Sequence, residues 1–248
     1  QNTRTRIEKH CVALDNSVKA YGPLANKDYS REDKLKILNL HNIETNSASN
    51  IAEDQNIWGR ALEGDPINNL DSIGENVFQR VKKIEETPEE PEYISLTFKR
   101  GIPTQMDGKP FSLEKIVIKC SELGAKHGVG RIVIFEDTIP ELGYKEKGIF
   151  ESPASVIIYT AHRYIEGAVL SKSEREIKRN IEQQGSDIVY RGDWYGSNRI
   201  ALSDFIEPME EKVNGMVIMK LFKGHVLVSK AHVPGSILLK PGARKGAY

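Results

Sequence analysis

The sequence predicts an α+β fold in which helices pack on an antiparallel sheet. Three observations support this class: an amphipathic helix pattern that begins at Ser112, an alternating apolar strand pattern at 93–98, and a strand–turn–strand pattern within 216–230. With 248 residues, the chain is long enough for one large domain or two small ones, with a buried core.

The N-terminal part of the chain predicts few regular elements. Ser30 and Asp33 have the spacing of a capped helix start, and the helix pattern ends near His41. Residues 43–57 are polar and predict a loop. Residues 64–95 are rich in Gly, Asp, Asn, Pro and Glu and end in an acidic run that contains prolines. We interpret this run as a solvated connector, and a docking tail is the alternative.

The next segment predicts a strand, a turn and a helix. Residues 93–98 alternate between apolar and polar types and predict the strand, and Asp107-Gly108 predicts the turn. Beyond Ser112, apolar residues recur at intervals of three and four, which predicts a helix with one apolar face. Cys120 lies on that face, so we expect it in the core.

Residues 131–135 predict a buried strand, and residues 137–148 predict a loop. The apolar pattern at 154–170 is ambiguous between helix and strand, and its length favours a helix. A further helix is predicted from the capping box at 173–176 to about Gly185, followed by one at 198–210. The predicted hairpin consists of strands 216–222 and 225–230, joined by Lys223-Gly224.

Charge and cysteine usage exclude several classes of protein. The chain has 35 basic and 35 acidic residues, so it lacks the basic excess of a nucleic-acid-binding domain. No apolar run reaches the roughly 20 residues that a membrane helix needs. Cys11 and Cys120 are far apart, and we expect reduced thiols in a cytoplasmic protein; a disulfide is the alternative. No H-x-x-x-H pair is present, and we expect no metal site.

The sequence also lacks the usual nucleotide-binding and hydrolase motifs. It contains no G-x-G-x-x-G, no G-x-x-x-x-G-K-[ST] and no Ser-Gly-Gly-x-Asp phosphate loop. It contains no nucleophile elbow and no H-E-x-x-H. These residues alone therefore predict no site for nucleotide phosphates.

Short motifs that stand in a fixed order are more informative. They are residues 2–8, 54–60, 91–93, 126–131 (K-H-G-V-G-R), 147–153 (K-G-I-F-E-S-P) and 161–163 (A-H-R), with Trp194 and Lys223-Gly224. Through these motifs, the stretch from Glu92 to Gly167 closely resembles the C-terminal domain of argininosuccinate synthase. The upstream motifs resemble segments of the same family, so the resemblance covers most of the chain.

The resemblance implies an ATP-dependent carbon–nitrogen ligase. In that family ATP activates the ureido oxygen of citrulline, pyrophosphate leaves, and the amino group of aspartate then displaces AMP. The resemblance assigns residues 1–45 to the end of an α/β nucleotide-binding domain, 46–230 to a synthetase domain, and 231–248 to a C-terminal tail. ATP with Mg is expected to bind mainly to an N-terminal region absent from this sequence. Because the chain also begins without Met, we expect roughly a hundred further residues upstream.

Three substrate-binding residues of the family are kept. By resemblance, Asn2 contacts both aspartate and citrulline, Arg6 lies at the citrulline site, and Glu136 holds the polar head of citrulline. Each of the last two has a structural alternative, namely an ion pair between Arg6 and Glu8 and a loop anchor at Glu136. The family's chemistry works by positioning and charge stabilisation, so no catalytic residue is predicted.

Four other positions depart from the family's pattern. Thr3 replaces an Asp that contacts aspartate, Ala52 and Ala61 replace serines at the citrulline site, and Phe150 replaces a Tyr. Two extra residues also lie between Glu136 and Phe150. Three hydroxyl groups are thus missing, which predicts an acceptor less polar than citrulline or a loss of function.

Two functions of different classes therefore stay open. The first is an active ligase that joins aspartate to a citrulline-type acceptor, and the second is a non-catalytic relic that serves as an oligomerisation or regulatory module. An intact phosphate loop upstream of Gln1 would favour the ligase. The resemblance also implies a homo-oligomer, a tetramer, and the Gly-containing tail at 241–248 predicts that its C-terminal arm is short or absent.

Overall fold

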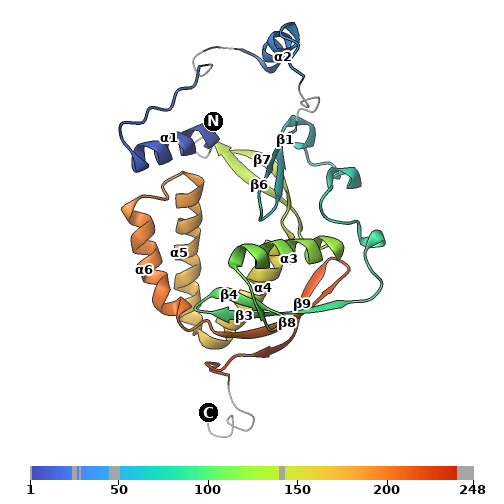
Figure 1. The fold of residues 1–248 in the computed structure, drawn as a ribbon, viewed down its shortest axis with the longest axis vertical. Helices are drawn as coiled ribbons and strands as arrows, with labels where there is room; N and C mark the ends of the chain where they lie inside the picture. Colours follow the sequence, from blue (N-terminus) through green and yellow to red (C-terminus); the bar gives the residue numbers. More distant parts are fainter. Residues whose placement is uncertain (1, 24–26, 28, 45–50, 140–142, 239–248) are drawn as a thin grey trace. The chain divides into compact units, whose positions relative to one another are not determined.

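The computed structural model describes residues 2–23, 27, 29–44, 51–139 and 143–238 (Figure 1). The predicted tail at 241–248 lies outside this part of the chain. The chain forms two compact units, residues 1–49 with 176–207 and residues 50–175 with 208–248. Helices and antiparallel sheets occur together, which confirms the α+β class.

The first compact unit is helical. It contains α1 (Asn2–Leu14), α2 (Arg31–Leu40) and most of α5 (Lys172–Tyr190) and α6 (Ser197–Glu210). The predicted start of α2 is confirmed, because Ser30 and Asp33 form a reciprocal capping box. Near the end of α5, Lys9 of α1 pairs with Asp193 at 2.7 Å. Contacts between residues distant in sequence therefore hold α1 in this unit.

A four-stranded antiparallel sheet, sheet A, forms part of the second unit (Figure 1). Its strand order is β1 (Ala52–Gln55), β2 (Arg60–Glu63), β7 (Tyr144–Glu151) and β6 (Arg131–Ile139). The loops predicted at 43–57 and 137–148 are therefore wrong where these strands occur. All of β1 and the first two residues of β7 are exposed, and neither segment has the apolar alternation that sequence could reveal, so backbone pairing makes them strands.

A five-stranded antiparallel sheet, sheet B, contains the predicted strand and hairpin. Its order is β5 (Lys109–Pro110), β4 (Ile102–Met106), β3 (Glu92–Lys99), β8 (Gly215–Phe222) and β9 (His225–His232). The predicted strand at 93–98, the turn at Asp107-Gly108 and the hairpin with its Lys223-Gly224 turn are confirmed.

The main core lies between sheet B and two helices, α3 (Leu113–Lys126) and α4 (Pro153–Val169), both of which the sequence predicted. Leu96 of the sheet, Ile116 of α3 and Ile157 of α4 are fully buried in it. Cys120 is also fully buried, as expected, and burial raises the pKa of its thiol to about 12. This thiol is therefore a packing group, and both cysteines are free in the structure.

The start of α5 differs from its prediction. Ser171, rather than Ser173, forms the capping box: its hydroxyl accepts from the N–H of Glu174 at 3.2 Å, and its own N–H donates to the Glu174 carboxylate at 2.7 Å. Two S-x-x-E motifs overlap here, at 171–174 and 173–176, and the first forms the capping box. The helix also continues past Gly185 to Tyr190, since a helical Gly costs only about 1 kcal/mol.

Residues 64–91 form an irregular connector that includes three short 3-10 turns, η1 (Asp65–Ile67), η2 (Glu75–Val77) and η3 (Ile84–Glu86). The glutamates at 85, 86, 89 and 90 in its acidic run are exposed, as predicted for a solvated connector. Upstream of that run, Ile67 and Val81 are buried. Ile67 packs with Leu62 and Ile149 of sheet A in a second, smaller core. Among the described residues, none of the helices has both the length and the apolar character needed to cross a bilayer.

Candidate functional site

One face of sheet A gathers four of the predicted substrate-binding residues. Ala61 of β2 is paired with Phe150 of β7, and Ala52 of β1 is paired with Glu63, two residues beyond Ala61. Because strand side chains alternate between faces, Ala52, Ala61 and Phe150 share one face. Glu136 of β6 shares it too, since it lies four residues beyond Ile132, which is paired with Phe150. We call this surface the acceptor face.

Gly148 brings two of these residues close together. A Cβ at this position would lie 2.7 Å from Cε2 of Phe150 and 3.7 Å from the carboxyl carbon of Glu136. The aromatic ring of Phe150 therefore covers the backbone of Gly148, and the carboxyl group of Glu136 lies beside it. A carboxylate next to an aromatic ring can hold a polar or cationic group while the ring covers an apolar one.

The other three predicted residues belong to α1, in the first compact unit. Arg6 donates from Nε to the carbonyl oxygen of Tyr190 at 2.6 Å, and its guanidinium lies 4.8 Å from the centre of the Tyr190 ring. Glu8 pairs with Arg4 at 2.6 Å instead of with Arg6. Asn2 and Thr3 begin α1, and their side chains lie outside the described part of the structure.

A buried ion pair supports the acceptor face from the opposite side of sheet A. Arg60 precedes Ala61, Glu151 follows Phe150, and the two charged side chains are 5% and 1% exposed with Nη1 and Oε2 2.8 Å apart. Arg60 also pairs with Glu53 of β1 at 2.9 Å. The same guanidinium thus joins three adjacent strands, β1, β2 and β7, and fixes the backbone that carries the acceptor face.

The ionisation of these carboxylates follows from their contacts. Burial opposes ionisation of Glu151, but hydrogen bonds from the N–H of Val81, the Arg60 guanidinium and the N–H of Arg80 outweigh it and hold its pKa below the ordinary value. The hydrogen bond from Arg60, aided by one from Gln55, lowers the pKa of Glu53 to about 2. Sequence reasoning missed the roles of Arg60 and Glu151, although a charged residue within each of the motifs at 54–60 and 147–153 was the available signal.

A second polar cluster links α4 and α6. Nε2 of His162 lies 3.0 Å from Glu210, and its Nδ1 lies 3.7 Å from Glu166, which is fully buried. Among the described residues, these three form the only group with the composition of a metal site. Arg163 donates to Glu166 at 2.7 Å, so a guanidinium already compensates that carboxylate. We interpret the cluster as an ion-pair network; its H-x-x-x-E spacing was not part of the sequence-based expectation.

Comparisons with known proteins agree on one family. The family model "Arginosuccinate synthase C-terminal domain" matches residues 51–239. Argininosuccinate synthase of Leuconostoc mesenteroides is 34% identical over 227 residues, which are 90% of this chain and 55% of the relative. The enzyme of that name from Staphylococcus epidermidis is 36% identical over 239 residues, 94% of this chain and 58% of the relative. The chain therefore spans somewhat more than half the length of the curated relatives it matches.

Proposed function

Because the chain belongs to the argininosuccinate synthase family, we propose that it forms the substrate-binding part of a ligase that joins aspartate to a citrulline-type acceptor, with ATP cleaved to AMP and pyrophosphate. The gathering of Ala52, Ala61, Glu136 and Phe150 on one sheet face is the observation that carries this proposal. These are the positions at which the resemblance puts the acceptor. Biosynthesis in the cytoplasm is part of the same proposal.

We assign ATP with Mg to the part of the relatives that this chain does not span. The sequence has no phosphate loop, and the Gly-rich turn before β6 has a different role. Gly130 has a φ of +100°, and a Cβ there would lie 2.5 Å from the backbone nitrogen of Pro153. This glycine permits close packing between the turn and α4 and does not face an open phosphate-sized space.

The contribution of this chain is then to hold and orient the acceptor. Glu136 supplies a carboxylate for a polar or cationic head group, and the ring of Phe150 covers the adjacent backbone. Where the family presents three hydroxyls, Ala52, Ala61 and Phe150 present none. A net hydrogen bond contributes about 1 kcal/mol and an unpaired buried polar group costs about 1–3 kcal/mol. Together these losses weaken citrulline binding by roughly a hundredfold, which favours a less polar acceptor.

A pyrophosphate-release assay tests the proposal on this chain joined to its nucleotide-binding part. With ATP, aspartate and citrulline, we expect weak turnover that rises when Ala52→Ser, Ala61→Ser and Phe150→Tyr are combined. Phe135→Tyr is the matched control, because Phe135 follows Ile134 and precedes Glu136 on β6, and so points to the opposite face.

Three outcomes separate the alternatives. If the unaltered protein uses citrulline with a KM below about 1 mM, the acceptor face accommodates citrulline without the three hydroxyls and the chain is an ordinary member of the family. If Phe135→Tyr raises turnover as much as the triple variant, the acceptor is not recognised on this face. If no acceptor supports pyrophosphate release, the chain is a non-catalytic relic of the family.

A further inference from the structure

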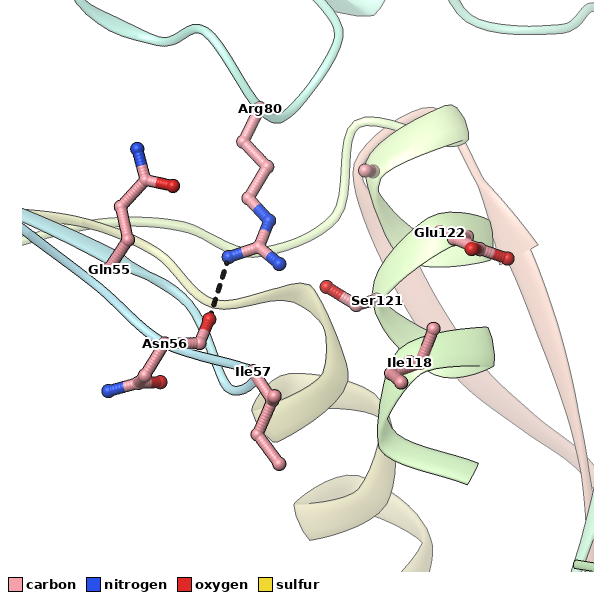
Figure 2. Close-up of a pocket in the computed structure, with 8 residues that line it drawn as sticks. Gln55, Asn56, Ile57, Arg80, Ile118, Ser121 and Glu122 are labelled. Carbon is pink, nitrogen blue, oxygen red and sulfur yellow. Dashed lines mark hydrogen bonds between the residues drawn. The ribbon is translucent and has the colours of Figure 1, made fainter. Parts of the chain in front are cut away.

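A second candidate binding site lies away from the acceptor face, in a pocket of about 620 Å³ within the second compact unit (Figure 2). The turn between β1 and β2 forms one wall, with Asn56 and Ile57, and α3 forms the other, with Ile118 and Ser121. Arg80 extends into the space between them. None of these residues belongs to the acceptor face, and nothing in the proposed ligase chemistry uses them.

The backbone that bears Arg80 is held in place from two sides. The buried carboxylate of Glu151 accepts hydrogen bonds from three successive N–H groups at 79–81, at 3.3, 2.8 and 2.8 Å. On the other side, the N–H of Lys82 donates to the carbonyl oxygen of Ala125 on α3 at 3.1 Å. This irregular segment is therefore rigid, and the position of Arg80 is fixed before any ligand arrives.

The guanidinium of Arg80 differs from those of Arg60 and Arg131 in the groups with which it pairs. Arg60 and Arg131 are paired with carboxylates at 2.8 and 2.6 Å. Within the described ranges, Arg80 has no carboxylate partner, and its side chain makes one hydrogen bond, from Nη1 to the carbonyl oxygen of Asn56 at 3.2 Å. Glu122 also lines the pocket, but its carboxylate points away from Arg80 (Figure 2). Among the described residues that line the pocket, none provides a carboxylate partner for the remaining guanidinium donors.

The opposite wall supplies the other features of a ligand site. Ser121 is 5% exposed and directs its hydroxyl across the pocket toward Arg80 (Figure 2). Beside these polar groups, Ile57 and Ile118 are 45% and 39% exposed, which leaves an apolar surface uncovered. A fixed guanidinium, a hydroxyl donor and two apolar side chains in one concave site match a small molecule with an anionic group and an apolar body.

We propose that this pocket binds a small organic anion. Its carboxylate or phosphate group accepts hydrogen bonds from the guanidinium of Arg80 and the hydroxyl of Ser121, and its apolar body packs on Ile57 and Ile118. The site is independent of the proposed ligase function, because the residues that form it and the residues of the acceptor face are separate sets.

Isothermal titration calorimetry on the full chain tests this site with three probes: phenyl phosphate, phenylacetate and the neutral 2-phenylethanol. We expect at least one anion to bind more tightly than the alcohol, and the tighter anion identifies the preferred group. Arg80→Gln should lower the affinity for that anion by about tenfold or more, because the substitution removes a charge-assisted hydrogen bond. Lys82→Gln is the matched control: it removes an exposed cation two residues away that does not line the pocket, and affinity should stay within about twofold.

Arg80→Gln keeps the backbone N–H that donates to Glu151, so its thermal midpoint should match that of the unaltered chain. Ser121→Ala provides a second variant that changes no charge, and a several-fold loss of anion affinity is expected. Failure of both anions to bind, equal binding of the alcohol, or unchanged affinity in Arg80→Gln would each overturn the proposal. An equal loss of anion affinity in Lys82→Gln would show that general surface charge, not the pocket, attracts the anion, and would also overturn the proposal.

Discussion

The carboxylate of Glu151 joins three parts of the second compact unit. It accepts from Arg60 on β2 and from three backbone N–H groups of the connector, while its own residue ends β7. A buried charge of this kind is tolerated only when its partners compensate the loss of water. Because the same carboxylate pairs with Arg60 in the sheet of the acceptor face and holds the backbone that bears Arg80, both candidate sites depend on one buried charge.

Glu151→Gln should therefore be costly. The change keeps the shape of the side chain but leaves Arg60, which is 5% exposed, without its buried partner. We expect the free energy of unfolding to fall by about 3–5 kcal/mol, measured by chemical denaturation. Glu75→Gln is the control, since the Glu75 side chain is 57% exposed and solvent screens its pair with Arg131, which should contribute about 1 kcal/mol or less. If both variants lost the same free energy of unfolding, the buried pair of Glu151 with Arg60 would contribute no more than an exposed carboxylate does.

The exposed partner of Arg60 predicts an acid-dependent loss of stability. The pKa of Glu53 falls from 4.5 to about 2 on folding, so the folded protein binds fewer protons than the unfolded chain between these values. The contribution of Glu53 is therefore present above 4.5 and is lost as the pH falls toward 2. Glu53→Gln should flatten the pH dependence of the thermal midpoint in this window, and Glu122→Gln, at an exposed residue, should not. A parallel pH profile in Glu53→Gln would refute this origin.

At the scale of secondary structure, the turn between α3 and β6 requires its glycine. Gly130 has a φ of +100°, and its carbonyl oxygen accepts from the N–H of Ser152 at 2.8 Å, next to Pro153. Gly130→Ala should lower the free energy of unfolding by about 2 kcal/mol or more, because both the backbone conformation and the space oppose a side chain.

Gly167→Ala is the opposite case and serves as the control. Gly167 lies inside α4, and nothing lies within 4 Å of a Cβ built there. This change should stabilise the protein by about 0.5 to 1 kcal/mol, since alanine restricts the unfolded chain and favours a helix. Both free energies of unfolding are measured by denaturant unfolding. If Gly130→Ala and Gly167→Ala lowered this free energy by similar amounts, the backbone conformation and the lack of space at Gly130 would not be the cause of the destabilisation.

The elements that sequence could predict are those whose signal is local. The hairpin β8–β9 combines two apolar runs with a Lys-Gly turn, and α3 combines a Ser cap with a regular apolar face. In contrast, all residues of β1 are exposed, and residues 145–147 of β7 are charged, so their strand state depends on pairing with distant segments. Sequence alone could not place these strands.

The same reason limits prediction of the acceptor face. The resemblance selected Ala61 and Phe150 as residues of one site. The register of β2 and β7 pairs them directly, and their role in binding stays a prediction. Only the register of four strands shows that Ala52 and Glu136 share the face. The support by Arg60 and Glu151 depends on burial on the opposite face, which no local pattern reveals.

At the scale of the whole molecule, we expect a homo-oligomer. The family implies a tetramer, and the predicted tail at 241–248 lies outside the described residues. Multi-angle light scattering at concentrations up to tens of micromolar should give a mass above that of one 27.9 kDa chain. A single species at the monomer mass over the whole concentration range would refute this expectation.

The composition of the first compact unit sets an order of events during synthesis. The contact between Arg6 and the carbonyl oxygen of Tyr190 joins residues 184 positions apart. At about 5–20 residues per second, the ribosome needs roughly 10–40 s to make the partner of α1 after α1 itself. Through that interval Arg6 and Lys9 lack the Tyr190 carbonyl and the Asp193 carboxylate that hold α1 in the folded protein. We therefore expect α1 to dock only after α5 has been made.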